Sequence, residues 1–269
     1  MDPLIVILAA GYGERLYLSS EAVALGDEQF PKGMLEIEGK RLIEYKLEAL
    51  PPEIRKAILL RKSRKFEPLE ELLRDRRGFR DDNILYQPRT TKFSTEPLTY
   101  FLGHFTWISR NSRYLKKFDP IIFVPVDTIV EGIDYLALLE YHRQQGADVT
   151  MLMKEGFKRG SNTRAYTLDG VRIVNAGQYL HPEWEARGCP ADMGVNLEPG
   201  QRTLTHDGTY VMGRRFFEMP LWNVFWQTIK PDYAKLFKDI KFVAYVTNGD
   251  WTDIRDPQNL EKVRSEFRK

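Results

Sequence analysis

The segment Leu4-Ile-Val-Ile-Leu-Ala-Ala-Gly-Tyr-Gly-Glu-Arg-Leu16 decides the fold. Its first half is a short, unbroken apolar run, which is typical of a strand buried on both faces of a parallel sheet. Gly11 and Gly13 follow where the chain must turn, and glycine allows both a positive φ and the close approach of a phosphate. The segment predicts a buried strand followed by an anion-binding turn. A plain turn between a strand and a helix explains the two glycines alone equally well.

Five later apolar runs predict further buried strands. They are residues 56–60, 83–86, 120–126, 148–153 and 241–246. Three stretches between the runs carry apolar residues at three- and four-residue steps, which is typical of helices packed on a sheet. The positions are Leu42, Tyr45, Leu47 and Leu50, then Phe66, Leu69, Leu72 and Leu73, and finally Leu136, Leu139 and Tyr141, with Gly146 as a C-terminal stop. This alternation predicts an α/β fold of the Rossmann-like type, with a mostly parallel sheet flanked by helices in three layers.

The second half of the chain has a different pattern, with shorter pieces rich in Gly, Asn, Asp and Pro. Asp169-Gly170 separates the strand-like residues 164–168 and 171–174, and this arrangement predicts a hairpin. No linker rich in Pro, Ser or charge separates the halves. We therefore expect a single domain, residues 1–269, whose sheet continues with a small antiparallel addition in the C-terminal half.

The composition excludes several classes of function. Lys and Arg total 40 against 38 Asp and Glu, and a net charge of +2 provides no basic surface for nucleic acid or an anionic membrane. Cys189 is the only cysteine, which excludes an intrachain disulfide and a thiolate metal cluster. No apolar run approaches the ~20 residues that span a bilayer, and residues 4–10 lack the basic leader of a signal peptide. We expect a cytoplasmic protein that binds neither nucleic acid nor membrane.

Two cations follow the glycine-rich turn at positions suited to phosphate. Arg15 stands two residues after Gly13, where a guanidinium can neutralise the phosphates of a nucleotide. Lys32 follows Pro31, and a lysine on a restricted turn can act as a point charge on phosphate. An ordinary solvated side chain is the alternative for Lys32, since most lysines are exposed.

Three motifs in this order resemble the N-terminal signature of the sugar-phosphate nucleotidyltransferases. They are Leu8-Ala-Ala-Gly-Tyr-Gly-Glu-Arg-Leu16, Pro31-Lys32 and Leu35-Glu-Ile-Glu-Gly-Lys-Arg-Leu-Ile-Glu-Tyr45. The resemblance implies a nucleoside triphosphate in the glycine-rich turn, contacted by Leu8, Ala9, Ala10, Gly11 and Gly13. It implies that Arg15 and Lys32 are the catalytic cations on the phosphates. It also implies a nucleotide-binding half, residues 1–118, and an acceptor- and metal-binding half, residues 119–269.

Two aspartates are candidate metal ligands. Asp127 directly follows the predicted strand 120–126, so it stands at the carboxyl end where ligands of such sheets bind. A hard cation such as Mg²⁺ prefers carboxylate and phosphate oxygens. A turn or a helix cap is the alternative for Asp127. Asp253 lies in Trp251-Thr-Asp-Ile254, and the resemblance implies that it is the second Mg²⁺ ligand. Asp256-Pro257 is also a sound helix start.

The residues for base and acceptor match the family less closely. Gln87 stands in the place of the glutamine that contacts the base, but the Gly-Thr-Ala motif expected after it is absent. Ala9-Ala10 resembles members that use UTP or CTP. The segment His206-Asp-Gly-Thr-Tyr-Val-Met212 resembles the lining of the sugar pocket, with Gly208 and Tyr210 in register. The Glu-Lys-Pro motif, whose lysine holds the acceptor phosphate, is missing near residues 175–178.

These features together predict an Mg²⁺-dependent enzyme that transfers a nucleotidyl group to a sugar 1-phosphate, releasing pyrophosphate. The expected partners are a nucleoside triphosphate, with a preference for UTP or CTP, and a phosphorylated sugar or alcohol. Transfer to inositol, choline or polyol phosphate stays open, as does a non-catalytic relative that binds nucleotide sugars. A homo-oligomer is compatible with the sequence. The long segment 17–30 is either a flap over the nucleotide or an ordinary insertion.

Overall fold

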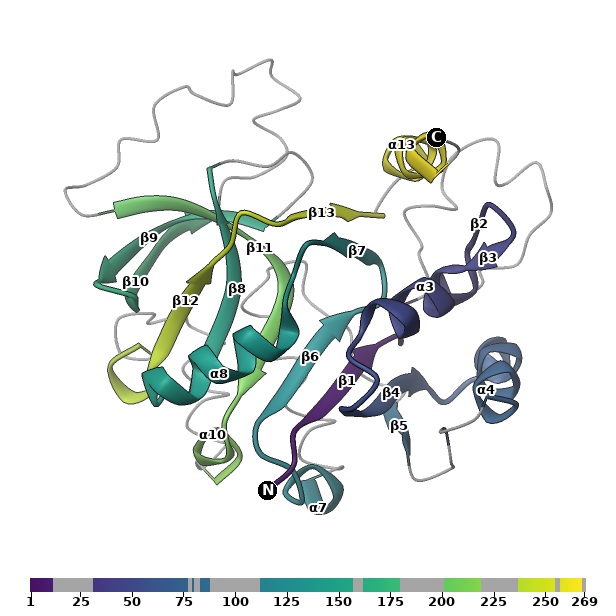
Figure 1. The fold of residues 1–269 in the computed structure, drawn as a ribbon, viewed down its shortest axis with the longest axis horizontal. Coiled ribbons are helices and arrows are strands. Elements are labelled where there is room, and N and C mark those ends of the chain that lie inside the picture. Colours follow the sequence, from purple (N-terminus) through teal and green to yellow (C-terminus); the bar gives the residue numbers. More distant parts are fainter. Residues whose placement is uncertain are drawn as a thin grey trace.

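The protein forms a mixed α/β fold around a nine-stranded sheet (Figure 1). The computed structural model describes residues 1–11, 31–76, 79, 83–87, 112–156, 162–179, 201–218, 237–254 and 257–267. None of the helices in these ranges is long and apolar enough to cross a membrane. The α/β class expected from the sequence is confirmed.

The strands of the sheet come from both halves of the chain. They are β1 (Leu4–Leu8), β4 (Arg55–Arg61), β5 (Ile84–Gln87), β6 (Ile121–Pro125), β8 (Val149–Glu155), β9 (Asn162–Asp169), β10 (Arg172–Tyr179), β11 (Gln201–Met212) and β12 (Phe242–Val246). Their order across the sheet is β5-β4-β1-β6-β11-β8-β12-β10-β9. Strand β1 pairs in parallel with β4 on one side and β6 on the other, and all its residues are buried. All six apolar runs are therefore confirmed as strands.

The direction of the strands differs between the two ends of the sheet. Strands β5, β4, β1 and β6 are all parallel. Strand β11 then runs antiparallel to both β6 and β8, although it lies in the middle of the sheet. The predicted hairpin is present as β9 and β10, which pair across Asp169 and Arg172. The antiparallel part is therefore larger than the small addition expected, because it includes β11.

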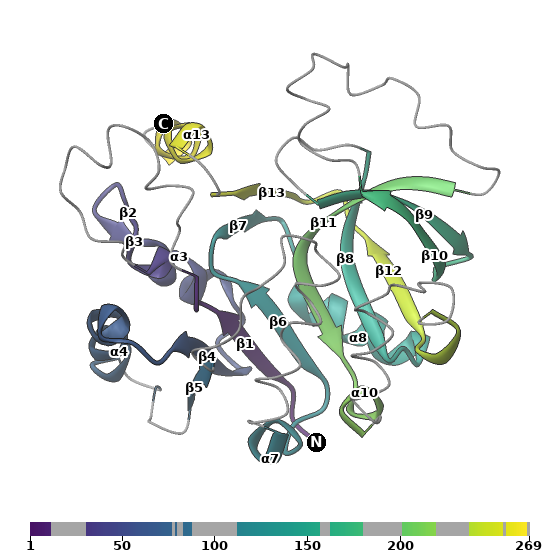
Figure 2. The same cartoon turned by 180° about the vertical axis from the view of Figure 1, so that it is seen from behind.

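Strand β11 changes its partner along its length. Its residues 201–206 pair with β9 and its residues 210–212 pair with β6, while β8 lies along its other side. The register shifts between His206 and Tyr210, as in a β-bulge. Gly208 in this bulge has a φ of +93°, which residues with a side chain rarely adopt. Because β9 pairs with both β10 and β11, the strands β8 to β12 close into a ring (Figures 1 and 2).

Helices pack on both faces of the sheet. Alternate residues of β1 point to opposite faces, so Ile5 and Ile7 belong to one buried cluster and Leu4 and Val6 to another. The first cluster includes residues of α3 (Leu42–Ala49), α4 (Glu67–Arg74) and α8 (Tyr135–Gln145). The second includes residues of α7 (Ser112–Leu115) and α10 (Arg214–Glu218).

The buried faces of two helices differ from the predicted ones. In α8 the buried side chains are Tyr135, Leu138, Leu139 and His142. Leu136 is 46% exposed, so its assignment to the buried face was wrong. In α3 the buried side chains are Leu42, Ile43 and Lys46, whereas Tyr45 and Leu47 are only half-buried. The helices exist as expected, but each is rotated about its axis relative to the predicted packing.

Helix α8 has clear signals at both ends. The Asp134 carboxylate accepts hydrogen bonds from the amides of Leu136 and Ala137, both at 2.9 Å, and thus caps the N-terminus. Gly146 ends the helix in the left-handed conformation, with a φ of +51°. The predicted stop at Gly146 is confirmed. The cap is Asp134 and not Asp127, which leaves Asp127 available for another role.

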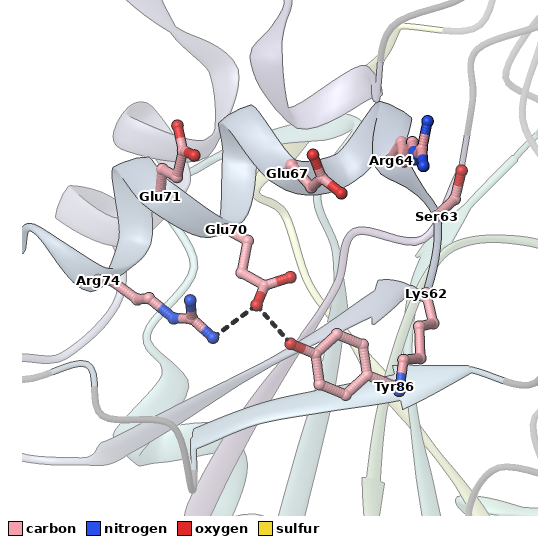
Figure 3. A pocket seen from close by; sticks show the side chains of 8 residues that line it. All are labelled: Lys62, Ser63, Arg64, Glu67, Glu70, Glu71, Arg74 and Tyr86. Atoms are coloured by element: carbon pink, nitrogen blue, oxygen red, sulfur yellow. Dashed lines mark hydrogen bonds and ion pairs between the residues drawn. The ribbon is translucent and has the colours of Figure 1, made fainter.

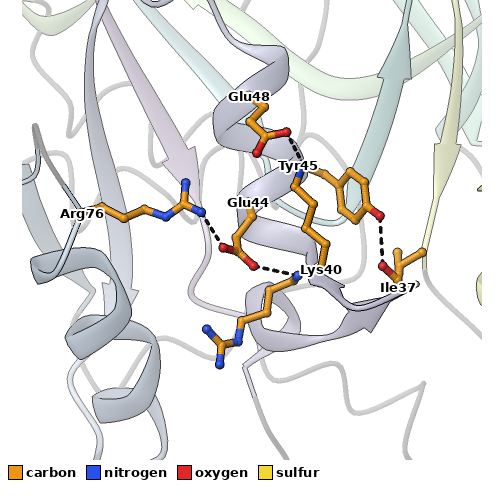
Figure 4. Close-up of polar contacts among 7 residues, drawn as sticks. Ile37, Lys40, Glu44, Tyr45, Glu48 and Arg76 are labelled. Atoms are coloured by element: carbon orange, nitrogen blue, oxygen red, sulfur yellow. Dashed lines mark hydrogen bonds and ion pairs between the residues drawn. The ribbon is translucent and has the colours of Figure 1, made fainter.

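A short hairpin precedes α3 and is fixed to it by polar contacts (Figure 4). Its strands are β2 (Glu36–Ile37) and β3 (Lys40–Arg41). The Tyr45 hydroxyl donates to the carbonyl oxygen of Ile37 at 3.0 Å, and the Arg41 amide donates to Glu44 Oε2 at 2.9 Å. Glu44 also pairs with Arg76 beyond α4. These contacts hold the hairpin that follows Lys32 against α3.

A second, two-stranded sheet continues from the carboxyl end of β6. Strand β7 (Thr128–Glu131) pairs antiparallel with β13 (Asp250–Asp253), which leads into α13 (Pro257–Phe267) (Figures 1 and 2). The helix start expected at Pro257 is confirmed, while its cap Asp256 lies outside the described residues. Ile254 and Val263 form a small buried cluster with Ile37 and Leu42. This cluster joins the C-terminal elements to the hairpin and α3.

Candidate active site

Lys32 and Asp127 form an ion pair at the carboxyl ends of the parallel strands. Lys32 begins the 3₁₀ turn Lys32–Met34, and Asp127 comes two residues after β6 ends. Lys32 Nζ lies 2.6 Å from Asp127 Oδ2, and the two side chains are 14% and 26% exposed. Both side chains therefore reach solvent, as a site for a soluble ligand requires. The alternative of an ordinary solvated side chain does not describe Lys32, which is largely buried and paired.

Gly11 lies beside this ion pair. The amide of Lys32 donates to the carbonyl oxygen of Gly11 at 3.0 Å, so the chain leaves β1 and returns to the same point. A side chain built on Gly11 would place its Cβ 4.0 Å from Lys32 Cδ, which is ordinary contact. Leu8, Ala9 and Ala10 lead from β1 to this point and are buried. The first part of the glycine-rich turn and Lys32 are thus adjacent.

Asp253 approaches the pair from the C-terminal end of the chain. In the β7–β13 sheet it stands opposite Thr128, and the Ile254 amide donates to the Asp127 carbonyl oxygen at 2.8 Å. The Ile254 carbonyl oxygen in turn lies 3.4 Å from Lys32 Nζ. Asp253 is buried, and Asn259 in α13 donates to its carbonyl oxygen at 2.8 Å. Segments around residues 11, 32, 127 and 253 therefore meet at one place.

Lys46 is a site residue that the sequence analysis missed. It lies on the buried face of α3 with a relative exposure of 5%, and its ammonium donates to the Thr128 carbonyl oxygen. Burial lowers the pKa of Lys46 to about 8, and the carboxylates of Asp207, Asp127 and Asp253 oppose that shift. Lys46 therefore carries its proton at neutral pH. A signal existed in the sequence, because Lys46 follows Ile43 by three residues and precedes Leu50 by four.

Asp207 is a second buried charge near these residues. It lies in the bulge of β11, where its two carboxylate oxygens accept from the Thr209 amide and the Thr209 hydroxyl, each at 2.7 Å. The Thr128 hydroxyl lies 3.5 Å from the Asp207 carbonyl oxygen. Burial raises the pKa of the Asp207 carboxyl, while the Thr209 hydrogen bonds and the Lys46 charge oppose the rise. The bulge therefore holds a buried carboxyl group that interacts electrostatically with Lys46.

Comparison with protein families identifies the class of the protein. The family model for nucleotidyl transferases matches residues 4–163 of the 269-residue chain. The chain belongs to the nucleotidyl transferase family. It is therefore an enzyme of the nucleotidyltransferase class, as the N-terminal motifs predicted. A search of curated proteins finds no match to the chain.

Solved structures confirm that this nucleotidyltransferase has the fold of its family. A Bacillus anthracis protein assigned as a glucose-1-phosphate thymidylyltransferase, in complex with sucrose, has a TM-score of 0.64 at 15% identity, covering 99% of this chain and 96% of that one. HddC from Yersinia pseudotuberculosis, complexed with GMP-PN, has a TM-score of 0.59 at 19% identity, covering 99% and 100%. The inositol-1-phosphate CTP transferase of T. maritima has a TM-score of 0.58 at 13% identity, covering 99% and 96%. At these identities the likeness establishes the fold alone.

The remaining predicted residues of the nucleotidyltransferase are placed as follows. Gly13 and Arg15 lie outside the described residues. Gln87 ends β5, paired with Arg61, and its side chain is likewise outside the description. Tyr210 is buried, and its hydroxyl lies 3.3 Å from His206 Nδ1. Gly208 lies in the bulge beside Asp207. The roles predicted for these residues stay predictions.

A separate open cavity of about 440 Å³ lies beside α4 of the nucleotidyltransferase (Figure 3). Its lining is charged and consists of Lys62, Ser63, Arg64, Glu67, Glu70, Glu71, Arg74 and Tyr86. Glu70 Oε1 accepts from the Tyr86 hydroxyl at 2.6 Å and lies 2.7 Å from Arg74 Nη2. Both contacts are made to the same oxygen of the Glu70 carboxylate. None of the predicted site residues lines this cavity.

Proposed function

We propose that this nucleotidyltransferase transfers a nucleoside monophosphate from a nucleoside triphosphate to a sugar 1-phosphate, in a reaction that requires Mg²⁺. The observation that carries the proposal is the meeting of Gly11, Lys32, Asp127 and Asp253 at one edge of the sheet. This edge is where ligands of doubly wound α/β sheets bind. Glycine, lysine and carboxylate are also the residue types that a metal-bound triphosphate requires.

Lys32 is the cation that we assign to the phosphates. Its ammonium is partly exposed beside Gly11, where the backbone leaves β1. An arriving triphosphate offers it oxygens with more negative charge than one carboxylate. The ammonium would then exchange Asp127 for phosphate and stabilise the charge that moves toward the leaving pyrophosphate. Arg15 would assist from the part of the turn outside the described residues.

Asp127 and Asp253 are the residues that we assign to Mg²⁺. Among the described residues no three His, Cys, Asp or Glu side chains gather closely enough to enclose a metal ion. Two aspartates fit Mg²⁺ nonetheless, because this ion usually takes one or two carboxylates and completes its shell with phosphate oxygens and water. When bound, it would neutralise phosphate charge and orient the triphosphate.

The reaction needs no covalent intermediate with the enzyme and no strong base. An acceptor phosphate oxygen already carries a negative charge near neutral pH and can attack the α-phosphorus directly. The oxygen forms a bond to phosphorus while the bond to pyrophosphate breaks. The protein therefore acts by alignment and by shielding of charge. Lys32 stabilises the leaving side, and the two aspartates would hold the metal that neutralises phosphate charge.

A second acceptor class, a non-sugar phosphorylated alcohol, is favoured by one observation. Strand β10 contains Asn175-Ala-Gly-Gln178 where sugar enzymes of this type carry an acceptor lysine. One structural relative is also described as an inositol-1-phosphate CTP transferase. We keep a sugar 1-phosphate as the first candidate and UTP or CTP as the preferred donors. The experiment below separates the acceptor classes.

The test is pyrophosphate release over a matrix of donors and acceptors, with and without Mg²⁺. The donors are the common nucleoside triphosphates, and the acceptors are sugar 1-phosphates and inositol, choline and polyol phosphates. We expect Mg²⁺-dependent release with one donor and one acceptor class, and loss of release in Asp127→Asn. No release across the matrix, together with tight binding of a nucleotide sugar, would establish a non-catalytic relative instead.

A further inference from the structure

Lys46 is the buried cation nearest to the proposed metal ligands. A lysine inside a helix face that packs on a sheet is unusual, because burial of an ammonium costs free energy unless charges and hydrogen bonds compensate it. Here the ammonium donates to the Thr128 carbonyl oxygen. Thr128 directly follows Asp127 and stands opposite Asp253 in the β7–β13 sheet. Lys46 therefore contacts the backbone between both aspartates.

The charges around Lys46 come from three distant segments. Asp207 acts on it most strongly, followed by Asp127 and Asp253. The positive charge of Lys46 opposes the rise in the pKa of Asp207. Two hydrogen bonds from Thr209 hold the Asp207 carboxyl group in place. Lys46 and Asp207 are thus two buried groups that interact electrostatically, and Lys46 contacts the backbone between the proposed metal ligands. Lys32 adds a second cation, which lies on Asp127.

The two lysines place positive charge beside the proposed metal ligands. Lys46 interacts with Asp127 and Asp253, and Lys32 forms an ion pair with Asp127. A free divalent cation entering this site is repelled by both ammonium groups. A triphosphate changes the balance, because it adds several negative charges and takes Lys32 as its own partner. The metal is then attracted more strongly than it was by the two aspartates alone.

We propose that the buried ammonium group of Lys46 weakens the binding of free divalent metal at Asp127 and Asp253, so that the metal is held only together with the nucleotide. This inference rests on the proposed function, since it assumes that these aspartates are the metal ligands. Asp207 sets the strength of the effect, because its carboxylate offsets part of the Lys46 charge. Neither Lys46 nor Asp207 has to touch the substrate for this role.

The role makes predictions of opposite sign for two variants. Asp207→Asn removes the carboxylate that offsets the Lys46 charge. The net repulsion between Lys46 and the metal therefore increases. The asparagine side chain can still accept a hydrogen bond from Thr209. The double variant Lys46→Met with Asp207→Asn removes the buried pair as a unit and leaves no unpaired charge. Repulsion from Lys46 is then absent, and the metal site becomes more attractive.

The experiment measures Mn²⁺ binding by electron paramagnetic resonance, with Mn²⁺ alone and with Mn²⁺ plus UTP or CTP in the absence of acceptor. For Mn²⁺ alone we expect the double variant to bind about fivefold or more tightly than the unmodified protein, and Asp207→Asn to bind more weakly. With nucleotide present, the Mn²⁺ affinities of the three proteins should differ less. Thermal unfolding of each variant shows whether it is folded.

A purely structural role for Lys46 predicts a different order of Mn²⁺ affinities among the three proteins. Both variants would then bind Mn²⁺ more weakly, in step with their loss of stability, and that result would overturn the inference. It would also be overturned if the double variant and the unmodified protein bound Mn²⁺ alone with equal affinity. If the unmodified protein bound no Mn²⁺ even with nucleotide, the proposed metal site itself would be wrong. Activity need not be measured for any of these outcomes.

Discussion

Lys32 Nζ and Asp127 Oδ2 lie 2.6 Å apart, although the two residues are 95 positions apart in the chain. The pair joins the turn after the glycine-rich segment to the carboxyl end of β6. In the proposed reaction each partner has a different ligand, phosphate for Lys32 and Mg²⁺ for Asp127. In the proposed reaction, the ion pair thus holds both side chains in place until the substrates replace it.

Replacement of Lys32 by alanine should slow the reaction strongly. The ammonium is expected to stabilise charge on the leaving pyrophosphate, and loss of one such group typically lowers turnover by about a hundredfold. Pyrophosphate release at saturating nucleotide measures the effect. Lys65→Ala, at an exposed position in the turn before α4, is the matched control and should leave turnover unchanged. Equal rates in both variants would remove Lys32 from the mechanism.

Replacement of either aspartate by asparagine should raise the Mg²⁺ requirement. Each variant keeps the shape of the side chain but loses a charged ligand, and we expect turnover to fall by about a hundredfold or more. Titration of the rate with Mg²⁺ separates weaker metal binding from misfolding. Asp134→Asn, which keeps an exposed capping side chain that is not among the proposed ligands, should show the normal Mg²⁺ curve. A normal curve in Asp127→Asn or Asp253→Asn would exclude that aspartate as a ligand.

Replacement of Asp134 by alanine should affect stability and not activity. The Asp134 carboxylate caps α8 through two hydrogen bonds, and loss of such a cap typically costs about 1 kcal/mol. Chemical unfolding measures the difference, and asparagine at the same position should restore most of it. A loss that asparagine does not restore would mean that the charge, rather than the hydrogen bonds, stabilises the helix.

His142 should make the protein less stable in acid. Burial lowers the pKa of His142 to about 4, and its Nδ1 lies 2.8 Å from the Thr150 hydroxyl oxygen. Between pH 6.5 and 4 the unfolded chain binds a proton here that the folded protein does not. The free energy of unfolding contributed by this residue is therefore intact above pH 6.5 and falls by about 3 kcal/mol on acidification to pH 4.

The measurement compares unfolding curves of the unmodified protein and His142→Gln across this pH range. Glutamine cannot take up the proton, so the difference between the two proteins should change with pH. Other groups titrate equally in both and cancel in the comparison. Curves that stay parallel would show that His142 has the same pKa in the folded and unfolded states.

Local patterns predicted the elements that carry the site. The strand from Leu4, the strand that precedes Asp127 and the stop at Gly146 each depend on neighbouring residues, which a sequence displays directly. The helix start at Pro257 is of the same kind. These predictions were correct because no distant contact overrides the local preference of the residues.

The unpredicted features depend on distant contacts. Strand β11 contains the polar residues Asp207-Gly-Thr209 at its centre, so it lacks the apolar pattern of a buried strand. Its place between β6 and β8 depends on segments that are distant in the sequence. The buried Lys46 interacts electrostatically with Asp207, which is far away in the sequence. A lysine in a helical pattern is normally assigned to the solvent face. Only its spacing from Ile43 and Leu50 indicated otherwise.

The hydrogen bond from the Lys32 amide to the Gly11 carbonyl oxygen has a consequence for how the enzyme can vary. This hydrogen bond holds the two ends of the segment between Gly11 and Lys32 together. The position of Lys32 therefore does not depend on the length of that segment. Doubling the length of a closed loop costs only about 0.6 kcal/mol. We therefore expect insertions or deletions within residues 17–30 to leave the lysine beside Asp127.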